Sequence, residues 1–282
     1  HALRKRRFQP RGRRRPVVEA AARPAGIVGW LDHFGSLVVR ALDDLGRFFY
    51  IMASSVLWTM RRPFDGTELL RQMVRVGWDS IPVVFLTCLF TGMFLALQTY
   101  RGFERFHAEG FVGSVVALSL TRELAPVLTG LMVAGRVGSA MAAELGTMRV
   151  TEQIDALYAM ATDPIHYLVV PRVNASILML PILTLVGDAV GVIGGWLVSV
   201  GLFGANSYLY MERTFQFLEV NDITSGLVKS AFFGLILAVT GCAKGFYTSG
   251  GAEGVGRSTT SAVVTASLYI LLSDFFLTKI LF

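Results

Sequence analysis

Long apolar runs separated by short polar stretches dominate the chain from residue 80 onward. Residues 80–100 and 189–211 contain 21 and 23 consecutive positions without a formally charged side chain. Because a transmembrane helix needs ~20 predominantly apolar residues, both runs are long enough to span a bilayer. The pattern predicts an all-α polytopic membrane protein with about five transmembrane helices. We expect the spans at residues 80–100, 111–138, 173–203, 227–246 and 258–280.

Residues 26–60 follow a different, amphipathic pattern. Apolar side chains recur every three or four positions and charged side chains fill the opposite side, which favours a helix lying in the membrane interface. Residues 67–79 predict a second, shorter interfacial helix, and Arg61-Arg62-Pro63 predicts the break between the two. The expected organisation is a basic tail over residues 1–25, amphipathic interfacial helices over 26–79 and a transmembrane domain over 80–282.

Composition agrees with a membrane protein, and the net charge is concentrated at one end. Hydrophobic residues make up 53% of the 282 residues and charged residues only 16%, whereas soluble domains carry about a quarter charged residues. The net charge of the chain is +6. Residues 1–23 hold nine Arg or Lys and one Glu, so the remainder of the chain is slightly acidic. We expect a disordered tail that fixes topology and touches anionic headgroups. A targeting remnant and a nucleic-acid-binding arm are the alternatives, and we expect no nucleic acid partner.

The loops orient the spans. With the basic tail inside, the positive-inside rule also places Arg136, Arg149, Arg172, Lys244 and Arg257 on the cytoplasmic side and the acid-rich 204–226 loop outside. Small residues recur every four positions in spans two and three, and such faces let helices pack closely, within one chain or across a dimer. The helix-packing residues are Gly130, Ala134, Gly138, Gly187, Gly191 and Gly195.

Nucleotide and metal chemistry find little support in the chain. Residues 251–258 read GAEGVGRS, close to a phosphate-binding P-loop, but Arg257 replaces the lysine and the stretch follows a membrane span instead of a strand. We expect a flexible cytoplasmic turn there. Cys88, Cys242 and four scattered histidines form no metal-ligand spacing. No catalytic residue, metal or cofactor is therefore expected in this chain, and any ATP must be bound by another one.

Two adjacent charges, Arg122 and Glu123, stand about eleven residues into span two. A charge at that depth costs ~2.5–3.5 kcal/mol on insertion scales, so it normally faces a cavity or a partner. Neighbouring helix positions are ~100° apart, and we expect at least one of the pair to face an internal cavity or another helix. The alternative is a later start of the span, with the pair at an interface. Gln98 could face the same space, and Asp188 is either a second lining residue or a capped break in span three.

Residues 147–164, TMRVTEQIDALYAMATDP, look like a soluble surface helix between two spans. Thr151 can cap its N-terminus, acidic residues occupy its first turn, and Asp163-Pro164 predicts its end. The result is a helix of about ten residues with an apolar stripe and an acidic face. Since so short a helix is marginal in water, it needs a docking surface, either its own membrane domain or a soluble partner.

Two sequence blocks, RELAP…AGRVGSA…AELGTM and EQIDAL…DP, resemble the MlaE-type permease of bacterial MCE lipid transporters and its chloroplast relative in the trigalactosyldiacylglycerol system. The resemblance runs from about residue 30 to the C-terminus and excludes the tail. It implies the permease of an ABC-type phospholipid transporter, paired as a homodimer. The implied partners are cytoplasmic ATPases, which bind ATP and Mg²⁺, and an MCE-domain protein on the outer side.

The resemblance also implies roles for particular residues. A coupling helix over residues 152–161 would contact the ATPase, and phospholipid would lie in a pocket between two copies. The implied coupling residues are Glu152, Gln153, Asp155, Leu157 and Tyr158, and the implied lipid-binding residues are Leu95, Gln98, Arg122 and Glu123. The implied location is the bacterial inner membrane or, alternatively, the chloroplast inner envelope.

Two other functions stay open. A proton-coupled secondary transporter could use Glu123 or Asp188 as its proton site. An integral membrane enzyme of lipid metabolism would need an acidic metal cluster or a nucleophile beside a base, and the sequence offers neither pattern.

Overall fold

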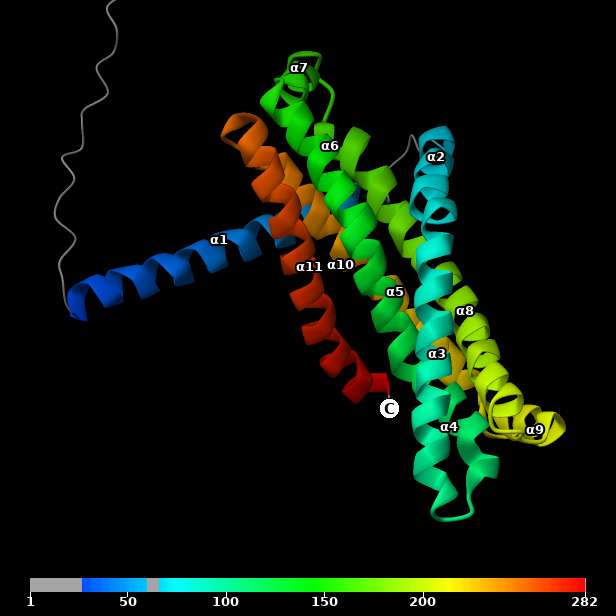
Figure 1. Cartoon of the computed structure of the whole chain (residues 1–282). Coiled ribbons are helices and arrows are strands. Elements are labelled where there is room, and N and C mark those ends of the chain that lie inside the picture. Colours follow the sequence, from blue (N-terminus) through cyan, green and yellow to red (C-terminus); the bar gives the residue numbers. More distant parts are fainter. Residues whose placement is uncertain (1–26, 60–65, 282) are drawn as a thin grey trace, which may run out of the picture. The chain divides into compact units, whose positions relative to one another are not determined.

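The computed structural model describes residues 27–59 and 66–281, and the elements in those residues are all helical (Figure 1). This confirms the predicted all-α class. The predicted basic tail lies outside the described residues. The α-helices are α1 (Ile27–Thr59), α2 (Gly66–Val76), α3 (Ile81–Glu104), α4 (Val112–Ser119), α5 (Ala125–Val133), α6 (Ser139–Val150), α7 (Gln153–Ala159), α8 (Val170–Gly201), α9 (Ser207–Phe217), α10 (Val220–Phe246) and α11 (Gly251–Leu281).

Five helical stretches among the described residues are long and apolar enough to cross a membrane, as the sequence predicted. Each helical stretch is longer than the apolar run from which it was predicted, because polar residues extend the helix at its ends. The segment expected as a separate interfacial helix at residues 67–79 is thus the first part of span one, joined to α3 by one 3₁₀ turn. The stretches are Gly66–Glu104, Glu109–Val150, Ile165–Gly201, Val220–Phe246 and Gly251–Leu281.

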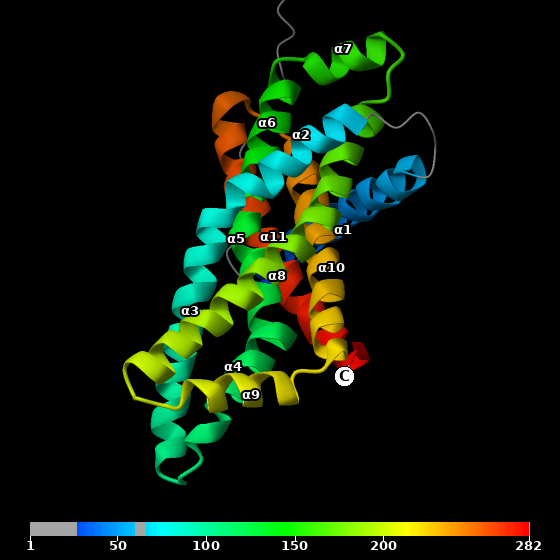
Figure 2. The same ribbon diagram turned by 90° about the vertical axis from the view of Figure 1, so that its right-hand side faces the viewer.

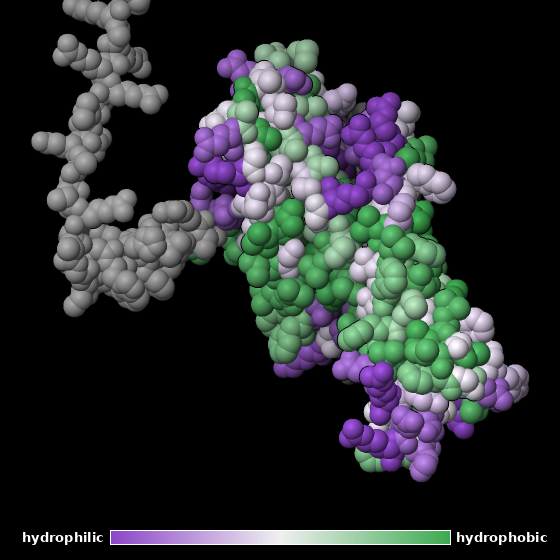
Figure 3. Space-filling model, in the orientation of Figure 1, coloured by the Kyte–Doolittle hydropathy of each residue, from purple (hydrophilic) through white to green (hydrophobic). Residues whose placement is uncertain are grey.

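The spans run between two ends of the bundle, which Figures 1 and 2 show at top and bottom. The α7 end carries α7, the start of α2, the end of α6 and the turn from α10 to α11. The α9 end carries α9 and the turn from α3 to α4. Figure 3 shows a hydrophobic band between hydrophilic side chains at the two ends, which is the surface that a membrane protein presents to lipid and water.

Helix α8 packs along α3 and α10. Glycine allows the closest approach: a Cβ atom on Gly92 of α3 would lie 1.9 Å from the carbonyl oxygen of Gly191 on α8. The small residues singled out on span three meet side chains of α3, α4 and α9, and Gly130 and Gly138 meet α10. These contacts join helices of this chain.

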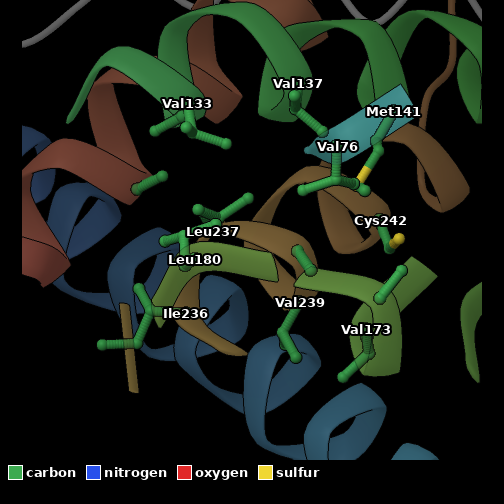
Figure 4. Packing of buried hydrophobic residues seen from close by; sticks show 14 of the residues in the cluster. Val76, Val133, Val137, Met141, Val173, Leu180, Ile236, Leu237, Val239 and Cys242 are labelled. Atoms are coloured by element: carbon green, nitrogen blue, oxygen red, sulfur yellow. The ribbon is translucent and has the colours of Figure 1, made fainter. Parts of the chain in front are cut away.

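Apolar side chains from several spans fill the remaining space (Figure 4). Val76, Val137, Leu180 and Leu237 each come from a different span, and all four are buried. Burying one such side chain contributes ~1.5–3 kcal/mol when the alternative is contact with water. When the alternative is contact with lipid, this hydrophobic contribution is absent. The core thus fixes the relative positions of spans one to four near the α7 end.

The described residues divide into two units between Gly46 and Arg47. Within the second unit, the last part of α1 packs on the bundle. Ile51 is fully buried there, the Phe48 and Tyr269 ring centroids are 5.4 Å apart, and the Trp58 and His166 centroids are 4.9 Å apart. The end of the predicted interfacial helix therefore belongs to the core.

The glycine-rich stretch expected as a flexible cytoplasmic turn is mostly helical, so that expectation was wrong. Helix α11 begins at Gly251 and includes the whole P-loop-like stretch. The chain reverses just before it, where Gly250 and Gly251 have φ angles of 95° and 68°. Glycine adopts such angles without strain, which explains why two glycines stand at this reversal.

Candidate functional site

The adjacent charges Arg122 and Glu123 lie in a π turn over residues 120–124, within span two. Such single π turns occur frequently at functional sites. The sequence supplies a local cause, because Pro126 has no N–H to donate to the carbonyl oxygen of Arg122 four residues earlier. That oxygen instead accepts a hydrogen bond from the Lys229 side chain on α10 at 3.0 Å.

Arg122 is held by the start of α10. Its Nε donates to Asp222 Oδ1 at 2.7 Å, and Asp222 Oδ2 accepts from the Glu219 backbone N–H at 3.1 Å. Asp222 is buried, whereas the Arg122 side chain is 42% exposed. Asp222 therefore serves two purposes, as part of the capping box of α10 and as the counter-charge of Arg122.

Glu123 is held about two turns further along α10, by Lys229. The Lys229 Nζ lies 2.8 Å from Glu123 Oε2, 2.7 Å from Thr278 Oγ1 and 3.4 Å from Asp274 Oδ1. Lys229 is fully buried, and its three N–H donors match three acceptors: the Arg122 carbonyl oxygen, Glu123 Oε2 and Thr278 Oγ1. The lysine thus ties span two to spans four and five at a depth where an unpaired charge would be costly.

We call this set the ion-pair cluster. It confirms the expectation that at least one of the adjacent charges faces another helix, and in fact both do. The cluster contains two cations and three carboxylates, so its formal charge is −1. Its members are Arg122, Glu123, Asp222, Lys229 and Asp274.

The other predicted lipid-binding residues lie apart from the ion-pair cluster. Gln98 is exposed on α3, and among the described residues no hydrogen bond or ion pair joins it to the cluster. Leu95 is half-buried in an apolar cluster that also contains Leu120, at the start of the π turn. The structure therefore brings Arg122 and Glu123 together with new partners and leaves the role of Gln98 and Leu95 as a prediction.

Asp188 does not end or break a helix, because α8 runs continuously through it. The alternative of a capped break was therefore wrong. The residue is 7% exposed, its Oδ1 is buried without a hydrogen-bond partner, and it lines a pocket of about 330 Å³ beside Thr121 and Phe215. Asp188 is thus a lining residue of an apolar pocket between α8 and α9.

The short helix expected between spans two and three exists as α7, but its ends differ from the prediction, and its coupling role stays a prediction. It covers Gln153–Ala159, seven residues. Thr151 does not cap it, since its hydroxyl donates back to the Thr147 carbonyl at 2.9 Å, and Glu152 takes the cap position with φ 61°. Asp163 does not end it either. Its carboxylate accepts from the Ile165 N–H at 2.9 Å and so caps the next helical segment.

One side of α7 faces the bundle and the other faces outward. Ile154 is fully buried and Leu157 packs against the core, while Gln153, Asp155 and Ala159 are exposed on the other side. Tyr158, one turn after Ile154, and Met160, just past the helix end, are 54% and 67% exposed. Asp155 pairs with Arg149 at the end of α6 at 2.5 Å, which fixes the helix on its neighbour. Burial and then the Asp163 carboxylate raise the pKa of the Tyr158 hydroxyl, so this outward-facing group is neutral at physiological pH.

Sequence reasoning missed three partners of the adjacent charges, namely Asp222, Lys229 and Asp274. The signal was present for two of them: Lys229 and Asp274 are formal charges inside predicted spans, where a charge indicates a partner or a function. Among the described residues, no group of three or more His, Cys, Asp or Glu side chains is placed to hold a metal ion.

A bundle of five spans that keeps ion pairs in its interior is typical of a membrane transport permease, in which buried ionisable groups border the substrate path. Comparison with known proteins identifies the family. Residues 69–280 match the family Permease MlaE, and the chain belongs to that family.

Curated relatives agree with this assignment. A probable ABC transporter permease protein of Rickettsia bellii is 49% identical over 89% of this chain and 97% of its own length. One from Synechocystis is 47% identical over 83% of this chain and 89% of its own length. The Arabidopsis thaliana chloroplast protein TRIGALACTOSYLDIACYLGLYCEROL 1 is 43% identical over 82% of this chain and 66% of its own length. The chain is therefore an ABC-type transport permease with several membrane-spanning helices.

Proposed function

We propose that this permease moves phospholipid, and that ATP hydrolysis in a separate, cytoplasmic ATPase subunit with Mg²⁺ drives the movement. The observation that carries the coupling is the two-sided packing of α7. Its inner side is fixed in the core by Ile154, and at its C-terminal end Tyr158 and Met160 are exposed to solvent. Exposed aromatic and thioether side chains on a rigid helix are typical of a protein-binding surface.

The connections of α7 allow it to transmit a displacement. Two residues separate it from α6, and five separate it from the helical segment that leads into α8. The ion pair between Arg149 and Asp155 adds a direct link to α6. In the proposed cycle, the ATPase subunits close on ATP and push α7, and spans two and three move with it because they are covalently continuous with it.

The lipid substrate is supported by the name of the Arabidopsis relative, which is that of a glycerolipid, and by the partial exposure of the ion-pair cluster. The side chains of Arg122 and Glu123 are 42% and 38% exposed, so polar groups are accessible on an apolar span. This is the lining that a molecule with a polar headgroup and apolar tails requires.

The assembly that we propose contains two copies of this chain and an MCE-domain protein at the α9 end, in a bacterial inner membrane or a chloroplast inner envelope. Helix α3 supports the pairing, because Leu86, Phe90 and Phe94 form an exposed apolar stripe on it. A second copy placed on that stripe would enclose Gln98, whose side chain is exposed one turn further along α3.

The coupling is tested by Tyr158→Glu and Met160→Glu, which change only exposed side chains. We expect both variants to insert normally but to lose the co-purifying ATPase and ATP-driven lipid transport. Glu104→Arg, an exposed charge reversal at the opposite end of the bundle, serves as the control and should retain both. Retention of the ATPase by both α7 variants would show that α7 is not the docking surface.

The lipid pocket is tested by a photo-crosslinking amino acid at position 98, with position 268 on α11 as the control. Both side chains are exposed, so both can reach lipid, but only position 98 lies on the proposed pocket. We expect position 98 to capture phospholipid in an ATP-dependent manner and position 268 to capture it independently of ATP. Equal behaviour at the two positions would contradict the pocket.

A further inference from the structure

A hollow with charged side chains in its lining lies between α2 and α6 near the α7 end, away from the ion-pair cluster. It has a volume of about 230 Å³, and its polar lining comes from Gln72, Arg75, Asp79, Arg136 and Glu144. Figure 3 shows hydrophilic side chains gathered there, at the border of the hydrophobic band. The hollow is therefore at the depth where a membrane places its headgroups.

The charges around this hollow do not cancel. Glu144 accepts from Arg172 Nη2 at 3.0 Å, and the Arg172 side chain is only 5% exposed, so this is the inner, desolvated partner of Glu144. Arg75 Nη1 approaches the same carboxylate from outside at 3.4 Å. Arg136 lies 3.8 Å from Asp79. Two guanidinium groups and two carboxylates line the hollow. Counting the buried Arg172, which lies outside the lining, three guanidinium groups share two carboxylates, so the ion-paired group as a whole carries a formal charge of +1.

Arg136 is already oriented. Its Nη2 donates to the Arg75 carbonyl at 2.6 Å and its Nε donates to Ser80 Oγ at 3.2 Å, so little conformational entropy is lost when it binds a ligand. Each arginine has five N–H donors. Among the described residues, only Nη1 of Arg75 and only Nε and Nη2 of Arg136 have a protein partner. The remaining donors belong to two side chains that line the hollow.

We infer that this hollow binds the phosphodiester of a glycerophospholipid headgroup in the leaflet at the α7 end. Guanidinium groups bind phosphate oxygens through paired, charge-assisted hydrogen bonds. Val76, Val137 and Met141 form the apolar part of the lining, against which the glycerol backbone rests. The volume is smaller than the ~300–1,000 Å³ of pockets that bury a whole ligand, so the hollow takes the headgroup while the acyl chains stay in the bilayer.

The site is tested in the purified full-length protein with a photo-crosslinking amino acid at position 140, an exposed alanine in the lining of the hollow. The probes are radiolabelled phosphatidylglycerol and diacylglycerol with the same acyl chains. We expect phosphatidylglycerol to label position 140 at least about tenfold better, because a hydrogen bond to a charged group contributes ~1.5–3 kcal/mol. A crosslinker at Thr147, which is exposed on α6 outside the hollow, should show no such preference.

Arg75→Gln is the decisive variant, since this side chain is half-exposed and its contacts with Glu144 are long. It should lower labelling by phosphatidylglycerol about tenfold, whereas Arg71→Gln, an exposed position one turn earlier on α2, should leave it unchanged. Arg136→Gln should act like Arg75→Gln, with an unchanged elution profile on size exclusion as the check of folding.

Three results would overturn the inference. Equal labelling by the two lipids would show an apolar groove without headgroup recognition. Undiminished labelling of Arg75→Gln would show that the arginine is not a ligand. Glycerol 3-phosphate competing as well as phosphatidylglycerol would show a site for soluble phosphate. Transport is not measured in these experiments, so they stand whether or not phospholipid is the transported substrate.

Discussion

Replacing Lys229 by methionine is expected to destabilise the bundle strongly, because this one buried side chain joins its own span to two others. Its Nζ donates to the Arg122 carbonyl, to Glu123 and to Thr278, and it lies 3.4 Å from Asp274. Methionine keeps most of the length and the apolar contacts of lysine. What it removes is the positive charge, so that two carboxylates face each other without a counter-charge.

The size of the effect follows from the burial. Removing one partner of a buried ion pair costs ~3–5 kcal/mol. The Arg122 carbonyl also loses its partner, and Pro126 cannot replace it, which costs ~1–3 kcal/mol for an unsatisfied buried acceptor. Because the Glu123 side chain is 38% exposed, it can regain some solvation. We therefore expect a loss of about 3 kcal/mol in the free energy of unfolding.

The measurement is equilibrium unfolding of the purified protein in mixed detergent micelles, with two variants for comparison. Lys279→Met removes an exposed lysine from α11 and should leave the free energy of unfolding unchanged. Glu123→Gln keeps an acceptor for Lys229 and removes one of the three negative charges of the cluster, so it should cost only about 1 kcal/mol. If Lys229→Met is as stable as Lys279→Met, the ion-pair cluster does not hold the spans together.

Two further predictions concern packing and Asp188. Gly92→Ala should destabilise the protein by about 1–3 kcal/mol, because its Cβ would meet the Gly191 backbone, whereas Gly102→Ala on the same helix has open space and should stabilise it slightly in the same unfolding assay. Asp188→Leu should raise the thermal unfolding midpoint, since it removes a buried oxygen without a hydrogen-bond partner from an apolar pocket. It should also leave ATP-driven transport intact in proteoliposomes, and loss of transport in a folded Asp188→Leu protein would favour the proton-coupled alternative.

The number of spans could be predicted from the sequence because each apolar run exceeds the length that a bilayer requires. The ends could not, since polar residues are compatible with both a helix end and a loop. Residues 66–79 illustrate this limit. Their amphipathic pattern fits an interfacial helix equally well, and only the packing of Val76 into the core shows that they continue span one.

The candidate site was half predictable for a related reason. A charge in an apolar span reveals that a partner exists, so Arg122 and Glu123 could be recognised. It does not reveal which partner, because Lys229 is 106 residues away along the chain and the face of α10 that meets span two depends on tertiary packing. The sequence predicted Asp222 in the 204–226 loop, because the apolar run begins only at residue 227. In the structure a capping box that contains Asp222 starts α10 before that run.

The polar contacts of span two suggest how movement of α7 would reach the rest of the bundle. Along its length this span is fastened to α10 by Arg122, to the 3₁₀ turn before α3 by Arg136, to α8 by Glu144 and to α7 by Arg149. The first two of these arginines lie in π turns, at residues 120–124 and 134–138.

A π turn is less stable than an α turn, and its conversion to an α turn rotates every residue beyond it. Displacement of α7 along span two can therefore be absorbed as rotation at two defined places, each held by an arginine with a partner on another span. In this arrangement the ion pairs are the contacts that must break and re-form when the span turns. Lys229 ties the π turn at residues 120–124 to two other spans at once. A rotation there would therefore change the lining of the proposed lipid pocket most strongly around Glu123.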